Sequence, residues 1–136
     1  MDPSFARAYV ALGSAYGKRG MHEEAIAMVQ KALAMSRDAA KLAALGRAYA
    51  AAGRKDEALR IIDELKELSK QQYISAYPIA LIYAALDETD PAFECLEAAY
   101  AERAGDLIFL KADPWLSPLR SDPRFADLLR RVGLAP

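Results

Sequence analysis

The feature that most constrains this chain is an internal repeat of 33 residues. Residues of the first copy return 33 positions later in the second: Leu12, Gly13, Tyr16, Gly20 and Ala25 reappear as Leu45, Gly46, Tyr49, Gly53 and Ala58. A weaker third copy follows at a spacing of 34, with Tyr83, Ala92 and Leu96 standing after Tyr49, Ala58 and Ile62. A period of this length indicates a supersecondary unit that stacks on its own copies, because one unit alone cannot bury its apolar face.

The composition favours helices for this unit. Alanine accounts for 29 of the 136 residues, and it has the best intrinsic helix propensity because it loses no side-chain entropy on ordering. The 7 glycines and 7 prolines cluster at places that are typical of helix boundaries. No stretch alternates apolar and polar residues long enough to predict a strand. We therefore expect an all-α fold.

The repeated residues resemble the tetratricopeptide repeat (TPR), a helix–turn–helix unit of about 34 residues. The first copy reads Tyr9, Leu12, Gly13, Tyr16, Gly20, Ala25, Val29, Ala32; the second reads Leu42, Leu45, Gly46, Tyr49, Gly53, Ala58, Ile62, Leu65; the third reads Ala76, Ile79, Ala80, Tyr83, Asp87, Ala92, Leu96, Ala99. The third copy lacks both glycines. The resemblance implies a right-handed solenoid of three repeats over residues 1–106, at about 6–38, 39–71 and 73–106.

Boundary residues predict where each helix begins and ends. The expected helices cover residues 5–19, 22–36, 38–52, 55–70, 75–86 and 89–103. Gly20 and Gly53 stand where a helix ends in a left-handed residue, which costs glycine little. Ser75 is expected to cap the fifth helix, with Pro78 in its first turn, where a missing N–H does no harm.

The last thirty residues do not form a fourth repeat, and we expect residues 107–136 to be a short helical cap. Asp113-Pro114 and Asp122-Pro123 are two helix starts, each with a capping carboxylate followed by proline. Repeat arrays need a terminal element over their last apolar face. The residues expected to cover it are Ile108, Phe109, Leu110, Trp115, Leu116, Leu119 and Phe125. The run from residue 119 to 134 is similar to the tail of TPR regions in bacterial adenylate cyclases, winged-helix regulators and protein kinases.

The first residues suggest a longer parent protein. Asp2-Pro3 resembles the close of a preceding repeat, so we expect a C-terminal fragment of a larger chain. The first helix would then present an uncovered apolar edge around Phe5, Ala8, Tyr9 and Leu12. Because such an edge promotes association between chains, a homo-oligomer formed through it is a further prediction.

Charge and cysteine content exclude several classes. The formal net charge of −1 argues against a nucleic-acid module, which is usually strongly basic. No apolar run approaches the roughly 18 residues of a membrane span, so no membrane insertion is expected. A single Cys excludes an intrachain disulfide and, with a single His, does not suffice for a zinc site. The counts suit a reducing, cytoplasmic compartment.

We expect no catalytic residue, no metal and no cofactor. Phosphate-binding loops, nucleophile elbows, zinc-binding pairs and dinucleotide fingerprints are missing from the sequence. His22 follows a turn and is read as a solvated surface residue. Cys95 has Glu94 beside it, and a nearby acid raises the pKa of a thiol. Non-enzymatic function is the prediction.

The resemblance implies a concave groove lined by the first helix of each pair, which takes an extended or helical peptide. Helical spacing assigns to this groove Arg7, Val10, Ser14, Lys18, Arg47, Tyr77 and Leu81. The cations and the apolar pair would suit a peptide with an acidic group beside an aliphatic or aromatic anchor. Alternatively, these residues tile a solvated surface or lie under the C-terminal tail. The familiar two-carboxylate clamp for chaperone tails uses Asn, and this sequence contains none.

Charge is uneven along the chain. Residues 71–106 hold seven acidic side chains and one basic one, and Asp90, Glu94 and Glu97 share a helix face that either meets a basic partner or is solvated. The leading hypothesis is a non-catalytic module that binds a protein or peptide through the groove. The alternative is an oligomerisation or regulatory C-terminal segment of a larger bacterial signalling enzyme or transcription regulator.

Overall fold

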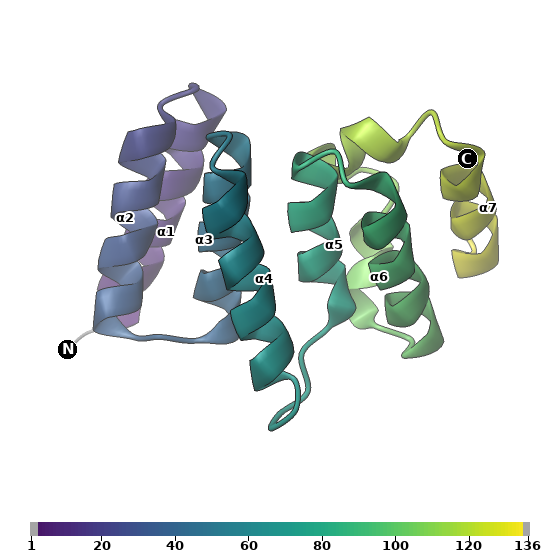
Figure 1. The fold of residues 1–136 in the computed structure, drawn as a ribbon, viewed down its shortest axis with the longest axis horizontal. Helices are drawn as coiled ribbons and strands as arrows, with labels where there is room; N and C mark the ends of the chain where they lie inside the picture. Colours follow the sequence, from purple (N-terminus) through teal and green to yellow (C-terminus); the bar gives the residue numbers. More distant parts are fainter. Residues whose placement is uncertain (1–2, 135–136) are drawn as a thin grey trace. The chain divides into compact units, whose positions relative to one another are not determined.

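The computed structural model describes residues 3–134, and every regular element in that range is helical. Three consecutive helix pairs are α1 (Pro3–Lys18) with α2 (His22–Met35), α3 (Ala39–Ala51) with α4 (Lys55–Leu68), and α5 (Ala76–Ala85) with α6 (Thr89–Ala101) (Figure 1). Two 3-10 helices and a last α-helix follow: η1 (Gly105–Phe109), η2 (Pro114–Leu119) and α7 (Pro123–Val132). The all-α prediction is confirmed, and each paired helix begins and ends within two residues of its expected bounds.

Contacts within the chain divide it into two compact units, Met1–Ile74 and Ser75–Pro136. The first unit holds α1 to α4. The second holds α5 and α6 together with the C-terminal helices. The third helix pair is thus grouped with residues 107–136, which the sequence had set apart as a cap, and a shared apolar core is the reason.

In the first unit, α1 and α2 approach closely at Gly13. A Cβ at this position would lie 2.9 Å from Val29 Cγ2 and 3.1 Å from the carbonyl oxygen of Ala25. Both distances are tighter than ordinary packing, so only glycine fits without a shift of α2. The Leu-Gly signature of the repeat therefore records a helix–helix contact.

All three helix pairs turn in the same way. Gly20 and Gly53 adopt left-handed φ angles of 76° and 78°, and the third copy places Asp87 there with φ 59°. At each turn a backbone N–H reaches back to the carbonyl of the repeat tyrosine: Met21 to Tyr16 at 2.9 Å, Arg54 to Tyr49 at 2.9 Å and Glu88 to Tyr83 at 3.0 Å. The third copy thus keeps the turn without glycine, because Asp tolerates this conformation better than most residues.

The predicted N-caps are confirmed. Ser75 accepts a hydrogen bond from the Tyr77 N–H, Asp113 from the Trp115 N–H and Asp122 from the Arg124 N–H. The last helix, α7, ends before Gly133, which is left-handed with φ 90°. Asp2, read in the sequence as the close of an earlier repeat, lies outside the described residues.

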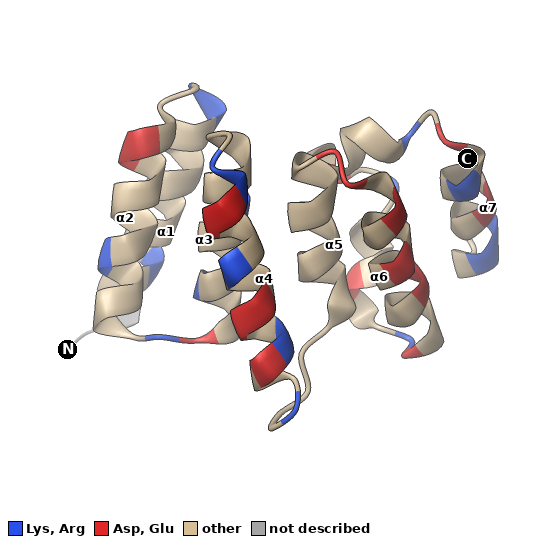
Figure 2. Cartoon of the chain, in the orientation of Figure 1, with Lys and Arg blue, Asp and Glu red and all other residues tan. Residues whose placement is uncertain are grey.

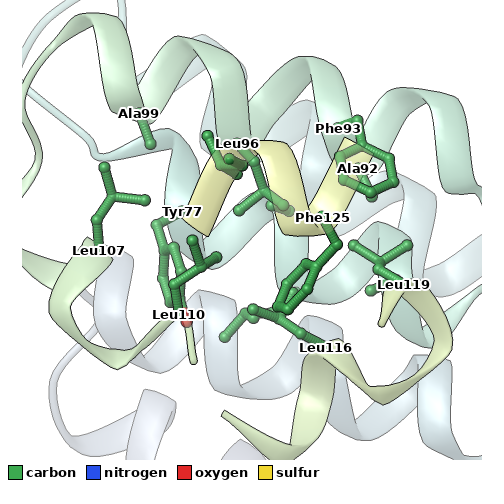
Figure 3. Close-up of a cluster of buried hydrophobic side chains, with 14 of the residues drawn as sticks. Tyr77, Ala92, Phe93, Leu96, Ala99, Leu107, Leu110, Leu116, Leu119 and Phe125 are labelled. Atoms are coloured by element: carbon green, nitrogen blue, oxygen red, sulfur yellow. The ribbon is translucent and has the colours of Figure 1, made fainter. Parts of the chain in front are cut away.

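The second unit is built around one apolar cluster to which α5, α6 and the C-terminal helices all contribute (Figure 3). Its buried members are Tyr77, Ala80, Leu81, Ala84, Ala92, Phe93, Leu96, Ala99, Ala104, Leu107, Leu110, Leu116, Leu119, Phe125, Leu128 and Leu129. Leu110, Leu116 and Leu119 are fully buried, as expected for a cap. The prediction was wrong for Ile108 and Phe109, which are 69% and 57% exposed, because η1 turns only its Leu107 toward the cluster.

Candidate partner-binding surface

One face of α1 carries exposed polar side chains. Arg7, Ser14 and Lys18 are exposed at helical spacings of seven and four residues, and Val10 is half-buried between them. The sequence of α1 contains no acidic residue from Pro3 to Lys18. The α1 members of the predicted groove therefore share one face, and that face is basic.

Helix α3 contributes Arg47, which stands 33 positions after Ser14 and is half-buried. Helix α3 contacts α1 as well as α2, so Arg47 and the α1 side chains lie on neighbouring helices of one unit. The remaining α3 positions of this face are alanines, of which Ala40 and Ala51 are exposed. The result is a surface of small residues with cations on it.

Tyr77 and Leu81 do not supply the apolar platform expected of them. They are 3% and 6% exposed and belong to the buried cluster of the second unit. The physical reason is that η2 packs on α5 and brings Leu116 and Leu119 into the same cluster (Figure 3). The alternative that the tail covers these positions is the one that the structure bears out.

A hydrogen-bond network centred on Asp113 fastens the tail to α5. The Tyr77 hydroxyl donates to Asp113 Oδ2 at 2.7 Å, while the Trp115 N–H donates to Oδ1 at 3.0 Å. The Arg120 guanidinium donates to the Asp113 carbonyl at 2.7 Å and to the Lys111 carbonyl at 2.6 Å. Burial, together with the hydrogen bond to Asp113, raises the pKa of Tyr77.

Sequence reasoning identified Asp113 as a cap but missed its bond to Tyr77. The available signal was the chemistry of the carboxylate, since a cap uses one oxygen and leaves the second free to accept. The local sequence pattern does not indicate which distant donor binds this second oxygen.

Helix α6 carries several acidic residues, and α7, which it contacts within the second unit, carries several basic ones (Figure 2). Asp90 forms an ion pair with Arg124 at 3.0 Å. Glu97 accepts a 2.8 Å hydrogen bond from Arg131 Nη1 and a second, shorter one from Nη2. The hydrogen bond from Arg131 holds the pKa of Glu97 below its ordinary value.

The same two arginines also stack on aromatic rings of α6. Arg124 lies over Phe93, 4.4 Å from the ring centroid, and Arg131 lies over Tyr100 at 5.1 Å. Two of the three acids on the predicted face therefore bind the chain's own tail.

The two residues singled out for chemistry are half-buried. His22, expected to be solvated, has a buried Nδ1 without a hydrogen-bond partner. Cys95 packs against the apolar cluster. In the part of the chain that the structure describes, no three His, Cys, Asp or Glu side chains are grouped so as to hold a metal ion. No described helix is both long and apolar enough to span a bilayer.

Antiparallel helix pairs that return every 33 or 34 residues and share one turn geometry define a helical-repeat protein. The family model described as Tetratricopeptide repeat matches residues 16–77. This segment, which runs from the end of α1 into the start of α5, is similar to tetratricopeptide repeats. Comparison with curated proteins found no match, and comparison with solved structures found none either. Repeats of this family generally mediate contacts between proteins.

Proposed function

We propose that this chain is a non-catalytic interaction module that binds a peptide or partner protein through the α1 and α3 face of its first unit. The observation that carries the proposal is the set of cations on that face: Arg7 and Lys18 on α1 and Arg47 on the neighbouring α3. Helix α1 itself carries no acidic residue. The ligand that suits this face is an extended or helical peptide bearing a carboxylate.

Electrostatics is expected to supply most of the selectivity. The alanines of α3 allow close approach of a peptide backbone but offer little apolar area, and Tyr77 and Leu81 are withdrawn into the second unit's core. Arginine pairs with a carboxylate through two parallel hydrogen bonds. Because exposed charge pairs are screened by salt, affinity for an acidic peptide should fall as ionic strength rises.

The experiment compares binding of fluorescent acidic peptides with that of their amide counterparts by anisotropy. The test variant is Arg7→Glu with Lys18→Glu, and the matched control is Arg60→Glu, an exposed position on α4. The double variant should weaken acidic-peptide binding by about tenfold or more, with no effect of the control. Equal losses in both variants, or binding of acid and amide peptides alike, would overturn the proposal.

A second candidate function is association through the outer edge of α1, as in an oligomerisation or regulatory segment of a larger bacterial signalling protein. Leu12 on that edge is 46% exposed, which favours a docking role. The bacterial and cytoplasmic setting is part of this proposal, and it is supported by the family-like run of residues 119–134 and by the single cysteine. Sedimentation of the chain over a range of concentrations tests self-association.

A further inference from the structure

The outer face of α1 is the counterpart of a face that is covered in α3. Leu12 is 46% exposed, whereas Leu45, 33 positions later, is 6% exposed. The two leucines occupy the same place in the repeat, so the difference comes from the neighbour and not from the helix. Helix α3 contacts α2 of the preceding pair.

The difference extends along the helix. Ala8, Ala15 and Arg19 are exposed, while their counterparts Lys41, Ala48 and Ala52 are half-buried. Phe5, which is 58% exposed, adds a fourth apolar residue one turn before Ala8. Residues 5, 8, 12 and 15 follow helical spacing and form one stripe, which we call the α1 edge.

The charges beside the α1 edge are all positive. Arg19 continues the stripe, Lys18 lies next to it, and Arg7 lies farther round the helix on the groove face; no acidic residue occurs from Pro3 to His22. None of the three forms an ion pair with another described residue. A helix that covers this edge is therefore favoured if acidic side chains flank its apolar stripe.

A second copy of this chain lacks such a helix among its described residues. Two α1 edges facing each other would bring like charges together, which is unfavourable. The large apolar side chains exposed elsewhere are Met21, Tyr73, Tyr100, Ile108 and Phe109. Of these only Tyr100 lies in an α-helix, and the guanidinium of Arg131 already lies over its ring.

Helix α2 shows what a covering helix looks like. Its Gln30 side chain donates to the Tyr49 hydroxyl of α3 at 3.0 Å, and Ile26 and Leu33 are buried one turn before and after it. Tyr16 is the counterpart of Tyr49 in α1. The template is an aliphatic, a polar and an aliphatic residue at i, i+4 and i+7.

We propose that the α1 edge docks an amphipathic helix of a different protein, with an aliphatic stripe flanked by Asp and Glu. The inference rests on the second candidate function and names the chemistry of its partner. The apolar residues 8, 12 and 15 of the edge are not groove residues, whereas Arg7 and Lys18 belong to the groove face, so only substitutions at the apolar positions separate this inference from the groove proposal.

The test uses two synthetic helical peptides of about four turns, the length of α1. Both carry the Ile, Gln and Leu template; one has Glu in its flanking positions and the other has Lys. Binding to the full chain is measured by anisotropy, and the oligomeric state by sedimentation. The variants are Leu12→Glu and Ala8→Glu on the edge, Ala34→Glu as an exposed control on α2, and Arg47→Glu on the groove face.

The Glu peptide should bind at least tenfold more tightly than the Lys peptide, and each edge variant should reduce that affinity at least tenfold. Ala34→Glu should leave it unchanged. A loss in Arg47→Glu with none in the edge variants would place the Glu peptide on the groove face and overturn the inference. If the chain dimerises and Leu12→Glu makes it monomeric, the occupant is a second copy and the inference fails while the second candidate function stands. A monomeric chain that binds neither peptide overturns both.

Discussion

Replacing Tyr77 tests whether this residue belongs to the core of the second unit or to a binding surface. Tyr77→Phe removes one hydrogen bond to a carboxylate, a contact worth about 1.5–3 kcal/mol when it is buried. Asp113 keeps the Trp115 N–H, so we expect a loss near the lower value. Tyr77→Ala also removes the ring from the cluster, and comparable core truncations cost about 3–5 kcal/mol.

The assay is urea unfolding followed by tryptophan fluorescence. Trp115 is the only tryptophan and packs against the cluster of the second unit, so its signal reports on that unit alone. A unit of 62 residues has a free energy of unfolding of roughly 3–9 kcal/mol. Tyr77→Ala should therefore remove about a third of it or more, whereas Tyr77→Phe shifts the midpoint measurably. A change below about 0.5 kcal/mol in both variants, typical of surface positions, would refute the reasoning.

The free energy of unfolding at alkaline pH gives an independent test of the contact between Tyr77 and Asp113. Burial and the hydrogen bond to Asp113 raise the pKa of Tyr77 above its ordinary value of 10.0. The unfolded chain then loses this proton at a lower pH than the folded chain, so the stabilisation is complete below pH 10 and declines as the pH rises further. Tyr77→Phe should lack this part of the decline. Parallel alkaline curves for wild type and variant would contradict the linkage.

Three further predictions concern packing, turns and charge. Gly13→Ala should destabilise the first unit by about 1–2 kcal/mol through overpacking. Gly17→Ala should stabilise the same unit by up to about 1 kcal/mol, because its Cβ would meet only a methyl carbon at 4.0 Å. Thermal unfolding followed by circular dichroism compares the two variants. Asp87→Gly should raise the stability of the second unit by up to about 1 kcal/mol, because it relieves a left-handed residue, and urea titration of Trp115 fluorescence measures this. Glu97→Gln should cost under about 1 kcal/mol at neutral pH, since the ion pair of Glu97 with Arg131 is largely exposed. Because the pKa of Glu97 is lowered in the folded chain, this contribution vanishes as the pH falls below the ordinary value of 4.5. Acid unfolding curves of wild type and variant should therefore converge.

The helices and their ends could be predicted because they depend on local chemistry. Period, capping side chains and left-handed turn residues act within a few positions of each other, and the sequence displays them directly. The third copy shows that the turn forms even where the expected glycine is missing. It lacks both glycines, yet Asp87 takes the same turn, since packing of the pair requires that turn and Asp tolerates it.

The prediction that Tyr77 and Leu81 line an exposed groove was wrong, because their cover comes from a distant segment. Helical spacing placed Tyr77 and Leu81 on the same side of their helix as the groove residues of the earlier copies. What it lacked was the path of residues 105–119, which brings η2 onto α5. A short 3-10 segment is too brief to give an extended periodic pattern of apolar residues, so its sequence does not indicate which helix it packs on. Ile108 and Phe109 were misassigned for the same reason.

Each pair in this chain has to cover the apolar side of its first helix, and the structure shows two solutions. Helix α3 is covered by α2 of the preceding pair, and α5 is covered by η2. In both cases polar contacts accompany the apolar cover: Gln30 binds Tyr49, and Asp113 binds Tyr77. Helix α1 contacts α2 and α3, yet its edge keeps Leu12 46% exposed. Because Leu45, the counterpart of Leu12, is only 6% exposed, the α1 edge is a place for a covering helix, and the positive charges of α1 favour an acidic amphipathic one.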